Sequence, residues 1–102
     1  MDLQELEKAR ERCRQELSEL TGWALGSLVE TSRMQGGRRK PFRYLSRSVH
    51  GKNRITYVSE SQAELLRQEL RKGRTAKKLL EQVADLTVAI IKTQTQRKGG
   101  GA

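Results

Sequence analysis

The chain has 102 residues, 34% hydrophobic and 32% charged, which suits one domain with a thin core and leaves no room for a second independent core. Its formal net charge of +9 favours polyanionic partners, and its single cysteine excludes an intramolecular disulfide and a multi-cysteine metal site. The charged N-terminus does not resemble a signal peptide, and the apolar run 88–91 is too short to cross a bilayer. We therefore expect a cytoplasmic chain without membrane contact.

The first predicted element is a helix within residues 1–21. Asp2 suits the N-cap, and Glu5 stands three residues later, as in a capping box. Apolar side chains then recur at helical spacing and form a seam: Leu3, Leu6, Cys13, Leu17 and Leu20. Because Cys13 belongs to this seam, we expect a buried structural thiol and not a nucleophile.

Residues 26–58 predict a three-stranded antiparallel β meander. The composition of residues 36–41 indicates a loop, and residues 50–53 indicate a turn. The loop and the turn separate three runs that are expected to form strands: residues 28–31, 42–47 and 54–58.

The last predicted element is a long helix over residues 60–96, capped by Ser59 or Ser61. Gly73 is expected to break or bend it. Small and apolar residues form its seam: Ala63, Leu66, Leu70, Gly73, Ala76, Leu80, Val83, Thr87 and Ile90. The prediction is thus an α+β fold, a single domain over residues 1–96 followed by a flexible basic tail at 97–102.

Positive charge is concentrated in the predicted meander, where residues 26–60 contain eight bases and only two acids. A basic β ribbon can lie in the groove of duplex DNA, with loop side chains on phosphates and strand side chains on bases. The candidate nucleic-acid-binding residues are Arg38, Arg39, Lys40, Arg43, Arg47, Lys52 and Arg54. The alternative is a solvated sheet whose charges prevent edge-to-edge aggregation.

Three aromatic residues of the meander, Phe42, Tyr44 and Tyr57, allow two interpretations. In a chain with so few aromatics, we expect them to anchor the sheet to the helices. The alternative is a platform on which the bases of a single strand stack.

The residue types needed for catalysis are not grouped in the sequence. His50 stands alone in a predicted turn, and Gly36-Gly37 is a loop signal without the pattern of a phosphate-binding loop. We therefore expect no enzyme activity, no cofactor and no metal. The two helical seams could pair within the chain or form a homodimer, which would duplicate the basic surface.

Several short segments carry a family resemblance: residues 26–30, 44–47, 51–52 and 57–58. Over about residues 20–92, the chain resembles an uncharacterised family of small basic prokaryotic proteins encoded near transposases and on other mobile elements. That family commonly has a short cysteine cluster between the first two strands, of a spacing that could bind zinc. Residues 34–40 contain no cysteine here, so the resemblance implies no metal site.

A looser resemblance, in topology and charge, is to the arm-type DNA-binding domain of tyrosine recombinases. It implies that the sheet reads DNA and supports Arg43, Arg47 and Arg54 as contact residues. The leading hypothesis is therefore a DNA-binding accessory or regulatory protein of a mobile element. The alternative is a protein-interaction module or small subunit that docks through its helical seams onto a recombinase or another nucleic-acid enzyme.

Overall fold

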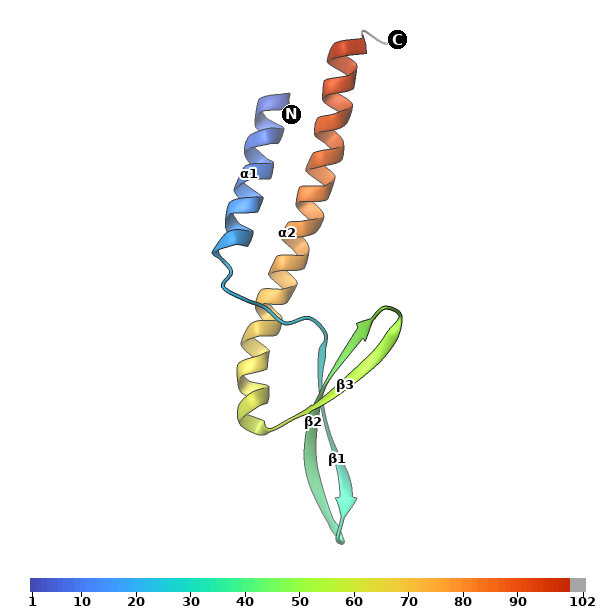
Figure 1. Cartoon of the computed structure of the whole chain (residues 1–102). Helices are drawn as coiled ribbons and strands as arrows, with labels where there is room; N and C mark the ends of the chain where they lie inside the picture. Colours follow the sequence, from blue (N-terminus) through green and yellow to red (C-terminus); the bar gives the residue numbers. More distant parts are fainter. Residues whose placement is uncertain (100–102) are drawn as a thin grey trace. The chain divides into compact units, whose positions relative to one another are not determined.

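The computed structural model describes residues 1–99 and confirms the α+β class, with a helix, a three-stranded sheet and a long helix in chain order (Figure 1). The elements are α1 (Leu3–Glu19), β1 (Ser27–Gln35), β2 (Arg38–Val49), β3 (Lys52–Val58) and α2 (Glu60–Gly99). The sequence predicted a single domain. Contacts between residues divide the chain into two compact units. The helical unit comprises residues 1–21 and the chain from residue 75 onward, and the sheet unit comprises residues 22–74.

In the helical unit, α1 pairs with the later turns of α2 in antiparallel orientation. The predicted N-cap is confirmed, because the backbone N–H of Glu5 donates to Asp2 Oδ1 at 2.8 Å. Two side-chain contacts join the helices: Arg10 donates to the Thr87 hydroxyl at 3.4 Å, and the Cys13 thiol lies 3.7 Å from Gln82 Oε1. The contact nearer the start of α1 involves the residue nearer the end of α2, which is the order of an antiparallel pair.

The core of the helical unit is small and aliphatic, with Leu6, Ala76, Leu79 and Ile90 buried. The sequence placed Leu80 in this seam, and that expectation is wrong, because Leu80 is 53% exposed while Leu79 is buried. Both leucines fit an alternation of three and four residues from Ala76, so spacing alone does not separate them.

The sheet is an antiparallel meander in the order β1-β2-β3, with strands longer than the sequence predicted. The loop expected over residues 36–41 is limited to Gly36 and Gly37, whose φ angles are +61° and +75°. Two successive positive φ angles make a type I′ turn, which continues the strand twist, and glycine adopts them without steric cost. Pairing therefore resumes at Arg38, opposite Gln35.

A reciprocal capping box at Ser59 starts α2. The N–H of Gln62 donates to Ser59 Oγ at 3.1 Å, and the N–H of Ser59 donates to Gln62 Oε1 at 2.8 Å. The helix continues through Gly73, so of the break or bend expected there, the break is not found. A Cβ at Gly73 would lie 1.9 Å from the carbonyl oxygen of Ala24, and the Ala24 N–H donates to the Glu69 carbonyl at 3.0 Å. Gly73 thus allows the segment before β1 to lie directly on the helix.

The end of α2 overlaps the tail expected over residues 97–102. The helix extends to Gly99, and the remaining three residues of that tail lie outside the described residues. Within residues 1–99, no helix is long and apolar enough to cross a membrane.

Candidate nucleic-acid interface

The two faces of the sheet differ in what covers them. Strand alternation and register place Leu28, Glu30 and Leu45 on one face. Glu30 forms an ion pair with Arg67 of α2, so this covered face lies toward the helix. The opposite, open face has Phe42, Tyr44 and Tyr57 in its middle.

Arg43 lies on the covered face, and its side chain is only 19% exposed. Its Nε is 4.0 Å from Glu30 Oε2 and, among the described residues, is buried without a hydrogen-bond partner. Glu30 also accepts a hydrogen bond from Arg67, which raises the pKa of Arg67 above its usual value. The expectation that Arg43 is exposed for DNA contact is therefore wrong. Its charge is directed at Glu30 instead.

The β1–β2 hairpin extends beyond β3 as a two-stranded ribbon (Figure 1). β3 pairs only with Arg43–Val49 of β2, so residues 32–41, here called the basic ribbon, pair only with each other. The ribbon contains four bases and no acid: Arg33, Arg38, Arg39 and Lys40. Arg33 stands directly opposite Lys40, and all four basic residues are exposed.

The remaining predicted cations lie at the other end of β2. Arg47 stands directly opposite Arg54 on the neighbouring strand, with both residues exposed, and Lys52 opens β3. Eight residues separate Arg39 from Arg47, which is about 26 Å along an extended strand. The structure therefore divides the predicted basic surface into two patches, one at each end of β2. Arg43 belongs to neither patch.

The aromatic side chains form a cluster on the open face, so the expectation that they anchor the sheet to the helices is wrong. The ring centroids of Phe42, Tyr44 and Tyr57 lie 6.0 to 6.1 Å apart in all three pairs. Tyr57 is 66% exposed, and Ile55 on the same strand is 50% exposed. The face that the helix leaves uncovered thus carries the aromatic rings together with the opposed bases Arg33 and Lys40, whereas Arg47 and Arg54 project from the other face.

Arg33 lies beside the aromatic cluster and was not among the candidate residues predicted from the sequence. Its guanidinium carbon lies 4.7 Å from the centroid of the Phe42 ring, in a cation–π arrangement. Extending β1 to Gln35 places Arg33 two residues beyond Thr31, which pairs with Phe42. Strand alternation would have placed Arg33 on the same face as Phe42 if β1 had been predicted to extend to Gln35.

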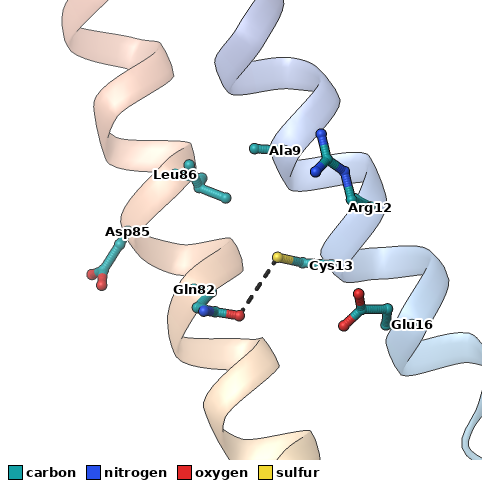
Figure 2. Close-up of a pocket in the computed structure, with 7 residues that line it drawn as sticks. All are labelled: Ala9, Arg12, Cys13, Glu16, Gln82, Asp85 and Leu86. Carbon is teal, nitrogen blue, oxygen red and sulfur yellow. Dashed lines mark hydrogen bonds between the residues drawn. The ribbon is translucent and has the colours of Figure 1, made fainter. Parts of the chain in front are cut away.

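The helical unit contains a groove between α1 and α2, with Cys13 directed toward Gln82 (Figure 2). Its lining mixes apolar and oppositely charged side chains: Ala9, Arg12, Cys13, Glu16, Gln82, Asp85 and Leu86. The Cys13 thiol is half-buried, so the burial predicted from the seam is found only in part. Among residues 1–99, no three His, Cys, Asp or Glu side chains are placed to hold a metal ion together.

Comparisons with protein-family models, curated proteins and solved structures give no match to this chain. The likeness to proteins of mobile elements, and to the arm-type domain of tyrosine recombinases, therefore stays a prediction. The chain has two basic patches, an open face with three aromatic rings, and a covered face on which Glu30 faces Arg43 and Arg67.

Proposed function

We propose that the sheet unit binds nucleic acid, with the basic ribbon as its main contact to phosphates. The observation that carries the proposal is the acid-free ribbon of residues 32–41, in which Arg33 and Lys40 stand directly opposite each other. Like charges in directly opposed positions destabilise a β ladder. A polyanion bound along the ribbon removes this repulsion and releases its own counterions.

The arrangement of the bases favours this function over a role in solubility alone. Scattered lysines are sufficient to protect an edge strand from aggregation. Here Arg47 and Arg54 repeat the opposed pairing at the far end of β2. Two repulsive pairs in one small sheet are unfavourable for folding, and they are what a surface for phosphates requires.

Binding of labelled oligonucleotides tests the proposal directly. Fluorescence anisotropy at low salt, with duplex DNA, single-stranded DNA and RNA of equal length, should detect binding by the unaltered chain. A variant with Arg33, Arg38, Arg39 and Lys40 all changed to Ala should bind about a hundredfold more weakly, because four phosphate contacts are lost.

The matched control changes four exposed bases of the helical unit to Ala: Lys8, Lys77, Lys78 and Lys92. It removes the same net charge from another surface, so we expect a loss of affinity of less than about fivefold. Equal losses in the two variants would contradict a specific role for the ribbon. No binding by the unaltered chain at low salt would overturn the proposed function.

The biological role that we propose is that of an accessory or regulatory protein of a mobile element. It is supported only by the sequence resemblance and by the charge of the sheet. Co-purification with a recombinase or transposase encoded in the same neighbourhood would test this role. The four-residue ribbon variant serves as the control, because a partner that is held only through bound DNA should be lost in it, whereas a direct protein contact should remain.

A second candidate function, association through the helices, is favoured by an exposed apolar stripe on α2. Leu80, Val88 and Ile91 follow one side of the helix, and each is more than half exposed. The seams themselves are used between α1 and α2, so this stripe is what the helical unit offers to a second copy of the chain. Sedimentation velocity of the chain and its Leu80→Gln, Ile91→Gln variant would detect such a dimer as a fall in mass in the variant.

A further inference from the structure

The aromatic cluster on the open face carries an inference that rests on the proposed function and specifies its ligand. Phe42 and Tyr44 alternate along β2, and Tyr57 is the direct neighbour of Tyr44 on β3, so all three rings project from the same face. Phe42 and Tyr44 are inclined to each other by only 28°. Tyr57 is inclined by 41° to Phe42 and by 67° to Tyr44, so the three rings form one contiguous cluster but not a flat surface.

Stabilisation of the sheet accounts for only part of this cluster. A cross-strand aromatic pair such as Tyr44–Tyr57 stabilises the pairing of β2 with β3. This contribution does not require Tyr57 to be 66% exposed, nor a third ring at Phe42 on the same strand as Tyr44. A tyrosine that anchored a core would be covered by the helix, and α2 faces the other side of the sheet through Arg67 and Glu30.

The charges beside the rings identify the kind of molecule that fits them. Arg33 lies over Phe42, and Lys40 stands opposite Arg33 on the same face. Planar aromatic rings next to closely spaced cations suit a ligand with planar groups along an anionic backbone. Guanidinium planes also stack on bases, so Arg33 can extend the platform as well as neutralise charge.

The distance between the rings suits the bases of an unpaired strand and not those of a duplex. The three centroids lie at least 6.0 Å apart, whereas successive bases in a helical stack are separated by about 3.4 Å. A strand must therefore be unstacked and extended to place bases on more than one ring. The bases of a duplex are stacked on each other and present only their edges in the grooves.

We propose that Phe42, Tyr44 and Tyr57 stack with unpaired bases of a single-stranded nucleic acid whose phosphates contact Arg33 and Lys40. The chain would then select single-stranded or strand-separated regions over an intact duplex. Stacking accepts every base, so little sequence preference accompanies this selectivity.

The test compares Tyr57→Leu with Tyr57→Phe by fluorescence anisotropy, using a labelled twelve-nucleotide oligothymidine and a duplex of the same length. Leucine keeps apolar bulk and removes the ring, whereas phenylalanine keeps the ring and removes only the hydroxyl. We expect the Leu variant to bind the single strand about five- to a hundredfold more weakly and the Phe variant to match the unaltered chain. Far-UV circular dichroism verifies that both variants fold.

The outcomes separate the two proposals. Binding of neither oligonucleotide at low salt overturns the proposed function and, with it, the stacking role. Tighter binding of the duplex, or equal binding by the Leu and Phe variants, overturns the stacking role and leaves the proposed function in place. A fall in sedimenting mass on Tyr57→Leu, with single-strand binding unchanged, assigns the open face to a second copy of the chain and also overturns it.

Discussion

The two faces of the three-stranded sheet share the same strands but differ in whether acidic side chains lie beside their bases. On the covered face, the acid Glu30 pairs with Arg67 of α2 and lies 4.0 Å from Arg43 Nε. On the open face, Arg33 and Lys40 stand opposite each other, and no acid lies in the ribbon that carries them. The comparison teaches that position in the fold, and not the number of bases, decides which cations are available to a ligand.

The faces also differ in their apolar side chains. Leu28 and Leu45 of the covered face are half-buried, as are the two aromatic residues that β2 places on the open face, whereas Ile55 and Tyr57 of the open face are at least half exposed. An exposed aromatic surface on a small protein marks a place of contact more often than a gap in the core. The exposed aromatic surface and the opposed Arg33 and Lys40 thus lie on the same face, which is the one that we propose for base stacking.

The largest effect on stability is expected where the segment before β1 lies on α2. Gly73→Ala should lower the free energy of unfolding by about 2 kcal/mol, because the added methyl group meets the Ala24 carbonyl oxygen. Alanine is the better helix former by about 1 kcal/mol, so an unchanged or increased stability in urea denaturation would contradict the close approach.

The ion pairs of the covered face are expected to give a smaller effect. Glu30→Gln should lower the free energy of unfolding by about 1 to 2 kcal/mol, because it leaves the largely buried Arg43 cation without its partner. Arg43→Met should be nearly neutral, since Glu30 keeps Arg67. Urea denaturation measures both, and a larger loss for Arg43→Met than for Glu30→Gln would contradict this assignment.

The opposed arginines at the far end of β2 sharpen the comparison, because their removal should change stability and binding in opposite directions. Changing Arg47 and Arg54 together to Thr should raise stability by a few tenths of a kcal/mol, about the value of the relieved repulsion. Affinity for nucleic acid should fall about fivefold as phosphate contacts are lost. Urea denaturation and anisotropy measure the two effects, and unchanged affinity would confine binding to the ribbon.

The smallest expected effect concerns the turn between β2 and β3. His50 has φ +53°, an unfavourable conformation for a residue with a Cβ, at the first position of a turn completed by Gly51. His50→Asn should raise the melting temperature slightly, corresponding to about 0.5 kcal/mol, because asparagine tolerates this conformation better. Single-strand affinity serves as the control and should not change.

Local signals in the sequence predicted the element order well. Asp2 and Ser59 start their helices through side-chain caps, and strand alternation grouped Phe42 with Tyr44. These features depend on residues a few positions apart. The glycine pair before Arg38 was interpreted as part of a longer loop, because composition does not distinguish a two-residue type I′ turn from an open loop.

Burial could not be predicted in the same way. Arg43 and Arg47 lie on the same side of β2, and only tertiary structure decides that the first meets Glu30 and the second stays exposed. Likewise, the sequence gives no sign of which sheet face α2 covers, so the aromatic residues were assigned to the core. The sequence thus predicted which segment of the chain contains the candidate site, but not which of its side chains lie together on an exposed face.

The central claim, that the basic ribbon holds phosphates, is tested most directly by the salt dependence of binding. The dissociation constant of the labelled single strand should be measured across salt concentrations for the unaltered chain and for the variant lacking Arg33, Arg38, Arg39 and Lys40. Each lost phosphate contact lowers the log–log slope by about 0.7 for a single strand, so the two slopes should differ by about 3. Parallel lines for the two proteins would contradict the account.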